Sequence, residues 1–134
     1  LSVERAWGNT STLWKSLGNS TFRANLEHTF QKPVIVLAGA QTFSAAEDFL
    51  IAFKQSNRGV VIGETTGGSS GQPLSFSLPA GGTARVCVKR DKYQSGKDWV
   101  GVGIAPDIIV KPSVLDIQNK TDAVLNAALL KLKK

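Results

Sequence analysis

Hydrophobic and polar positions recur along this chain with two periods, which predict a mixture of strands and helices. Residues 33–39 form an apolar run typical of a buried strand, and an amphipathic segment follows in which Phe49, Leu50 and Phe53 lie on one side. A second apolar run covers residues 59–63. The order of strand, helix and strand predicts a βαβ unit whose two strands are parallel.

The second half of the chain is predicted to contain a β-hairpin with one buried face. Apolar and polar residues alternate over 74–78 and again over 83–89, and a Pro-Ala-Gly-Gly turn at 79–82 lies between them. Cys87 falls in the second of these strands, between two valines, and is expected to be a packed strand residue.

An edge strand and a helix are predicted at the end of the chain. Pro106 restricts residues 105–110 to an edge or terminal position, because proline cannot donate to a strand ladder. Residues 121–132 carry a helical apolar stripe, capped by Thr121 or Asp122 and ended by lysines. Together with the βαβ unit, these elements predict an α/β fold.

The first 32 residues show the weakest pattern. Their aromatic and apolar side chains are spread without a clean period, so we expect an irregular or helical lead-in, with short helical turns near residues 11–17 and 21–29. Residues 33–134 then form the core. No repeat or linker divides the chain, and its 134 residues fit a single domain.

Composition argues against several classes of protein. The formal net charge is +6, but the basic residues are scattered and do not interleave with aromatic ones, so no nucleic-acid partner is expected. No apolar run reaches membrane-spanning length, and we expect no signal peptide within these residues. With one cysteine and one histidine, neither an internal disulfide nor a His/Cys metal cluster is expected, and no cofactor is predicted.

Two further features are assigned no chemistry from the sequence. The Gly- and Ser-rich residues 64–73 lack the Gly-Lys-Ser or Gly-Lys-Thr ending of a phosphate-binding loop, which argues against a nucleotide site. His28 lies beside a glutamate upstream of the first strand, and we interpret it as a surface or packed residue.

Ser44 lies where the first strand of the βαβ unit turns into the helix, and it has two interpretations. In one, Ser44 and Glu47 form a capping box, because this Ser-x-x-Glu spacing satisfies free N–H groups at a helix start. In the other, Ser44 is a nucleophile at the helix N-terminus, where the same N–H groups stabilise developing negative charge. The local pattern leaves both open.

Three motifs in sequence order resemble one known family. They are Thr42-x-Ser44-Ala45-Ala46-Glu47, Gly63-Glu64-x-Thr66-x-Gly68, and Gly101-x-Gly103-Ile104-x-Pro106-Asp107-Ile108-x-Val110. Followed by a terminal helix, this order resembles the tail-specific, or C-terminal processing, serine peptidases, a family that includes tricorn-like peptidases and related retinoid-binding modules. The resemblance runs from about residue 33 to the end.

This resemblance implies a crotonase- or ClpP-like α/β core and hydrolysis of peptide bonds through an acyl-enzyme. It implies that Ser44 is the nucleophile and that the Ala45 N–H is one donor of the oxyanion hole. The substrate would be a peptide or protein, and the location would be the periplasm, the cell envelope or the outside of the cell.

The sequence also departs from the family pattern. Where one branch places a catalytic lysine, this chain has Ser69, and the glutamate of the tricorn-like branch is replaced by Val100. Asp98 lies two residues earlier, on the same side of a strand, and we hypothesise that it supplies the carboxylate. An alternative is that Asp98 is simply a turn residue.

The upstream histidine of this family would precede Leu1. We therefore expect residues 1–134 to be the C-terminal part of a longer catalytic domain, inactive without an upstream segment that supplies the base. A second interpretation is a peptidase-like module that has lost catalysis and binds a peptide or a hydrophobic ligand.

Overall fold

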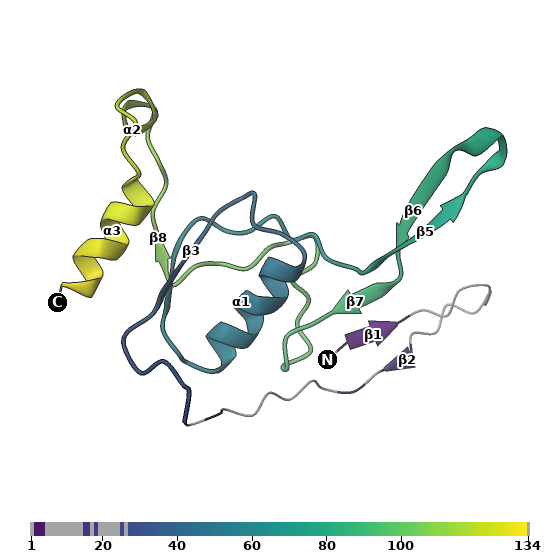
Figure 1. Cartoon of the computed structure of the whole chain (residues 1–134), viewed down its shortest axis with the longest axis horizontal. Coiled ribbons are helices and arrows are strands. Elements are labelled where there is room, and N and C mark those ends of the chain that lie inside the picture. The colour runs from purple at the N-terminus through teal and green to yellow at the C-terminus, as the bar shows by residue number, and fades with distance from the viewer. Residues whose placement is uncertain (1, 5–14, 17, 19–24, 26, 134) are drawn as a thin grey trace.

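The computed structural model describes residues 2–4, 15–16, 18, 25 and 27–133 (Figure 1). In chain order the elements are β1 (Ser2–Glu4), β2 (Lys15–Ser16), β3 (Ile35–Ala38), α1 (Ala45–Gln55), β4 (Val60–Gly63), β5 (Pro73–Ser77), a 3-10 turn (Pro79–Gly81), β6 (Thr83–Cys87), β7 (Lys89–Asp91), β8 (Ile108–Ile109), α2 (Val114–Gln118) and α3 (Ala123–Leu132). The strands form three small sheets, with the orders β2-β1-β7, β3-β4-β8 and β5-β6. The predicted α/β class is confirmed.

The βαβ unit has the predicted form. Strands β3 and β4 are parallel, with a register that runs from Ile35 opposite Val60 to Ala38 opposite Gly63, and α1 connects them. Strand β8 adds to β4 in parallel and occupies the edge of this sheet, as the proline before it predicted.

The main core lies between α1 and the central sheet. Leu50 and Phe53 of α1 are buried against Val61 of β4, and Trp99 and Ile104 complete the cluster from a later segment. Ile62 is fully buried as well and points to the opposite face of the sheet, because side chains alternate along a strand. Helix α3 contacts β3 and β4, and it lies across these strands from α1 in Figure 1.

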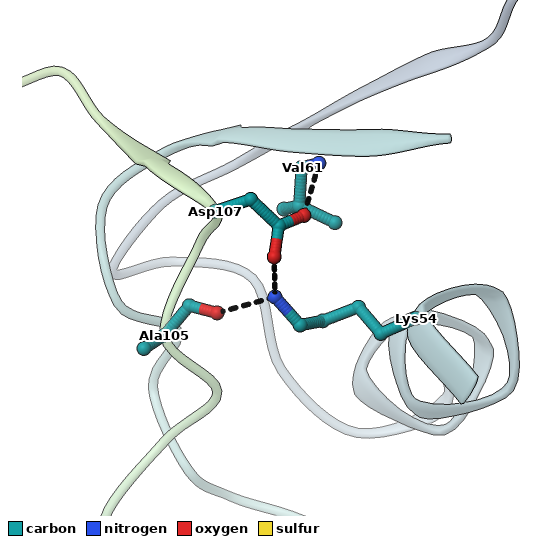
Figure 2. A network of polar contacts seen from close by, with 4 residues as sticks. All are labelled: Lys54, Val61, Ala105 and Asp107. Atoms are coloured by element: carbon teal, nitrogen blue, oxygen red, sulfur yellow. Dashed lines mark hydrogen bonds and ion pairs between the residues drawn. The ribbon is translucent and has the colours of Figure 1, made fainter. Parts of the chain in front are cut away.

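A polar network fastens α1 to the end of the core (Figure 2). The Lys54 ammonium donates to the Ala105 carbonyl at 3.0 Å and forms an ion pair with Asp107. The second carboxylate oxygen of Asp107 accepts the Val61 N–H at 2.8 Å. One carboxylate therefore joins the helix, the central strand β4 and the segment that leads into β8.

The β5–β6 hairpin forms as predicted, but its expected buried face is wrong. The register pairs Leu74 with Val86, so these side chains share a face, yet they are 38% and 43% exposed. Cys87 is exposed too, contrary to expectation. The physical reason is that the hairpin extends away from the α/β core (Figure 1), so the core leaves these side chains exposed.

In the N-terminal segment, one sequence expectation is wrong where the structure describes it. Lys15 and Ser16 lie in strand β2, where a helical turn was expected, because β1 pairs antiparallel with both β2 and β7 and fixes an extended backbone there. The rest of residues 11–17 lies outside the described residues. Of the second expected turn, the described part holds a short turn in which the His28 N–H donates to the Asn25 carbonyl at 3.3 Å.

The C-terminal helix is confirmed, and Asp122 caps it by accepting the Leu125 N–H at 2.8 Å. Its apolar stripe is only partly covered, since Ala128 is buried while Leu125 and Leu129 are 42% and 47% exposed. Helix α2 (Val114–Gln118) was not predicted from the sequence, and it consists of little more than one turn, capped by Ser113. None of the helices in the described residues is long and apolar enough to cross a bilayer.

The Asp107 network predicts unequal effects of two substitutions. Asp107→Ala leaves the Val61 N–H without its acceptor, so the free energy of unfolding should fall by about 1–3 kcal/mol. Lys54→Ala removes only the partly exposed ion pair and the bond to Ala105, and should cost less than about 1 kcal/mol. Urea unfolding of both variants measures the difference, and an equal loss in the two would contradict this account.

The same network predicts a pH dependence. Burial alone would raise the pKa of the Asp107 carboxyl, but the hydrogen bonds from Lys54 and the Val61 N–H and the charge of Lys54 outweigh it and lower the pKa below 3.8. A lowered pKa in the folded state stabilises the fold above the ordinary pKa, and this is lost as the pH falls through the lowered value. The stability gap between wild type and Asp107→Ala should therefore be full at neutral pH and narrow in strong acid.

Candidate functional site

Ser44 occupies a strained turn between β3 and α1. The turn begins where the Thr42 N–H donates to the Gly39 carbonyl at 2.8 Å and the Thr42 hydroxyl accepts the Gly39 N–H at 3.1 Å. Ser44 then adopts φ 58° and ψ −129°, and α1 begins at Ala45. A residue with a Cβ in such a conformation costs about 1–3 kcal/mol and persists where surrounding contacts enforce it, often at functional sites.

Ser44 and Glu47 have the arrangement of a capping box. The Glu47 carboxylate returns to the Ser44 N–H at 3.2 Å, as a capping box requires. The Ser44 hydroxyl faces the start of the helix but makes no cap hydrogen bond, and the Glu47 N–H donates to the Ser44 carbonyl at 2.8 Å. The capping-box arrangement predicted for Ser44 and Glu47 is present, whereas the role of Ser44 as a nucleophile stays a prediction.

The loop after β4 folds directly over this turn. The Ser69 carbonyl accepts the Ser44 N–H at 2.7 Å, and the Gly67 N–H donates to the Thr42 carbonyl at 2.9 Å. Ser69 is the residue that aligns with the lysine of one family branch, so the structure places that position beside Ser44.

Glu47 lies beneath both segments and is fully buried. Its carboxylate accepts the Gly68 N–H at 2.7 Å and the Ser69 N–H at 2.9 Å, and it also accepts the hydroxyl of Thr66, a residue with 5% exposure. The sequence predicted only the contact of Glu47 with Ser44 in a capping box. The additional partners come from a loop some twenty residues away, and the local Ser-x-x-Glu pattern carries no signal for them.

A third segment, residues 99–104, closes against the same loop. The Gly101 N–H donates to the Gly68 carbonyl at 2.6 Å, and the Ile104 N–H donates to the Thr66 hydroxyl oxygen at 2.8 Å. Gly103 has φ 88°, and a Cβ on it would lie 2.2 Å from the Thr66 carbonyl oxygen. The second glycine of the Gly-x-Gly motif therefore lets the backbone of this segment approach the backbone of Thr66 more closely than any residue with a Cβ would.

Asp98 and Val100 flank the buried Trp99. Val100, at the position of the family glutamate, is half-buried and packs against the core. The Asp98 carboxylate accepts hydrogen bonds from Arg90 at 3.1 and 2.9 Å and has Lys92 at 3.7 Å. Among the described residues its hydrogen bonds go to Arg90 rather than to the Ser44 turn.

Several acidic side chains lie near the start of α1. Burial, followed by the charge of Asp91, raises the pKa of the Asp48 carboxyl, and Lys89 opposes this shift. Burial and then the charge of Glu47 raise the pKa of the Tyr93 hydroxyl. In the part of the chain that is described, His28 is exposed, and no three His, Cys, Asp or Glu side chains gather as metal ligands would.

Comparison with known proteins finds peptidases. The model of peptidase family S41 matches residues 6–110. A chloroplastic C-terminal processing peptidase of Tetradesmus obliquus is 35% identical over 83 residues, which are 62% of this chain and 18% of that protein. A carboxyl-terminal-processing protease of Synechocystis sp. is 27% identical and covers 96% of this chain and 32% of its own length. The structure of mature CPAF has a TM-score of 0.63 at 26% identity, over 66% of this chain and 18% of that one.

A serine at a strained strand-to-helix turn is where hydrolases with an α/β core place their nucleophile. The match over most of its length shows that the chain belongs to peptidase family S41. The resemblance to C-terminal processing peptidases is therefore confirmed. The chain spans 18 to 32% of the length of the two processing proteases.

The strain at Ser44 can be measured by comparing two substitutions. Ser44→Gly should be more stable than Ser44→Ala by about 1 kcal/mol, because glycine adopts a positive φ without a Cβ clash, and this gain exceeds its added entropy in the unfolded chain. Both variants lack the hydroxyl, so their comparison isolates the backbone. Thermal or urea unfolding gives the difference, and greater stability of the alanine variant would show that the turn is relaxed.

Proposed function

We propose that this chain is the nucleophile-bearing part of a serine peptidase domain. The Ser44 oxygen attacks the carbonyl carbon of a peptide bond, and its proton passes to a base outside residues 1–134. The amine then leaves with a proton, and water hydrolyses the resulting acyl-enzyme. The observation that carries this proposal is the strained turn that places Ser44, with φ 58°, directly before the N-terminus of α1.

Ala45 supplies one donor to the oxyanion in this proposal. It is the first residue of α1, and the N–H groups of a first helical turn lack partners four residues back in the helix. In this proposal, the N–H directly after the nucleophile would donate to the oxygen on which negative charge develops, and the helix dipole would add to its effect.

The base and the full extent of the domain also belong to this proposal. In this proposal, residues 1–134 are the C-terminal part of a longer catalytic domain with a crotonase-like core, and an upstream segment completes the site. The greater length of the matched relatives is consistent with a longer parent protein. The 134 residues alone would hydrolyse peptides negligibly. By family resemblance, the protein acts on peptides or proteins outside the cytoplasm.

A catalytically impaired binding module is the second candidate. Ser69 and Val100 stand where the two family branches carry a lysine and a glutamate, and Arg90 engages both oxygens of the proposed substitute, Asp98. Such a module would use the same surface to hold a peptide or a hydrophobic ligand without cleaving it.

Substitution of Ser44 separates the two candidates. In the complete protein, including any chain beyond residues 1–134, Ser44→Ala should lower kcat by about 10³-fold or more and abolish labelling by a fluorophosphonate probe. Ser77→Ala, which removes the hydroxyl of an exposed serine on the hairpin, is the matched control and should still be labelled. Equal turnover by wild type and Ser44→Ala would remove Ser44 from the mechanism, and a folded wild type that neither turns over nor labels would favour the binding module.

Asp98 is tested by its isosteric amide. If Asp98 orients the base, Asp98→Asn should lower kcat by about 10²-fold or more with a stable fold, because an amide cannot stabilise a protonated base as a carboxylate does. The control is Arg90→Gln, which removes the ion pair but keeps the carboxylate. Full activity of Asp98→Asn would assign Asp98 to the surface ion pair alone.

A further inference from the structure

The carboxylate of Glu47 is the most deeply buried charged group described in the chain, with 0% exposure. It accepts four hydrogen bonds, from the N–H groups of Ser44, Gly68 and Ser69 and from the hydroxyl of Thr66. The bonds are divided evenly, with Gly68 and Thr66 on one oxygen and Ser44 and Ser69 on the other. Each carboxylate oxygen thus accepts two hydrogen bonds, each from a different donor.

The direction of these bonds fixes the chemical state that Glu47 needs. Three of its partners are backbone N–H groups, which can only donate. The hydroxyl oxygen of Thr66 accepts the Ile104 N–H at 2.8 Å, so its own hydrogen is directed to Glu47. Four donors require an acceptor on both oxygens, which an ionised carboxylate provides and a carboxamide does not.

These bonds converge on the one strained residue of the site. The Ser44 N–H is held between the Glu47 carboxylate at 3.2 Å and the Ser69 carbonyl at 2.7 Å, and Ser69 is itself held by the same carboxylate. A positive φ in a residue with a Cβ persists only where its surroundings enforce it. The Glu47 carboxylate supplies that constraint in two ways. It accepts the Ser44 N–H directly, and it holds Ser69, whose carbonyl accepts the same N–H.

Thr66 extends the constraint to the third segment. Its N–H donates to the Ile104 carbonyl at 3.2 Å while its hydroxyl accepts the Ile104 N–H, so Thr66 and Ile104 are joined in both directions. The Gly101 N–H meets the Gly68 carbonyl next to the Glu47 contact. Residues 44–47, 66–69 and 101–104 thus share one buried polar centre.

We propose that Glu47 and Thr66 act as a pair of positioning residues, which hold the Ser44 backbone and the 66–69 loop in the geometry required for attack. Neither side chain touches the substrate. This proposal rests on the proposed role of Ser44. It adds that the orientation of the Ser44 hydroxyl depends on the buried hydrogen bond between the Thr66 hydroxyl and the Glu47 carboxylate. A displacement of a nucleophile by about 1 Å can cost about 10²-fold in rate, so losses on this scale are expected when the pair is broken.

The test uses the complete protein and three substitutions. Glu47→Gln keeps the shape but turns an NH₂ group toward backbone donors, and Thr66→Val keeps the shape without the hydroxyl. Each should lower kcat by about 10- to 100-fold per folded molecule, with KM changed less than about threefold. Thr66→Ser restores the hydroxyl and should recover most of kcat. The double variant Glu47→Gln/Thr66→Val should be no worse than the poorer single variant, because the two act as a unit.

Val61→Ala is the control for a general loss of stability. It opens a cavity in the buried core of β4, outside the polar centre, and should lower the melting temperature without lowering kcat per folded molecule. The fraction of folded protein comes from circular dichroism at the assay temperature, and the concentration of intact sites comes from fluorophosphonate burst labelling.

The outcomes separate this proposal from the one on which it rests. Equal turnover by wild type and Ser44→Ala overturns the proposed function and this pair with it. Loss of activity in Ser44→Ala but unchanged kcat in Glu47→Gln and Thr66→Val overturns the pair alone. If both variants lose activity only in proportion to unfolding, as Val61→Ala would, Glu47 and Thr66 are ordinary structural residues. A kcat loss in Thr66→Val that Thr66→Ser reverses supports the pair.

Discussion

A carboxylate that is shielded from water holds three separate segments of this chain together. Burying an unpaired anion is among the most costly acts in folding, and it becomes tolerable only when hydrogen bonds replace the lost water. Glu47 meets that condition through the N–H of Ser44, directly before its helix, and through donors from the loop after β4. The loop therefore cannot leave the helix without removing hydrogen bonds from a buried anion, so Glu47 helps to fix residues 66–69 in place.

The parallel sheet does the rest of the positioning. Strands β3 and β4 are in register and deliver both the Ser44 turn and the loop to the same edge, since the carboxyl ends of parallel strands lie together. The Lys54–Asp107 network fastens the other end of α1 to β4 and to the segment before β8 (Figure 2). The helix is thus fixed at both ends by carboxylates, one of them buried and one partly exposed.

Local periodicity predicted the main helices and strands that form in this fold, but it did not predict which of their side chains are buried. The parallel βαβ unit, the hairpin and the C-terminal helix follow from alternation and helical spacing within short windows, and the structure contains all three. The exposure of the hairpin and of Cys87 depends on where distant elements lie, which a period of two does not encode. For the same reason Ser44 could be found from its motif, whereas the burial of Glu47 by Gly68 and Ser69 could not. The catalytic roles of Ser44, Ala45 and Asp98 stay predictions.

The two-stranded hairpin has a consequence for the behaviour of the protein in concentrated solution. Among the described residues, strands β5 and β6 pair only with each other, so no described strand covers their outer edges, and Leu74 and Val86 lie half-exposed between those edges. An open edge beside apolar side chains is a template to which strands of other molecules add. We expect self-association of this chain to begin at the hairpin while the α/β core is still folded, and colloidal stability to be limited by this sheet before the core unfolds.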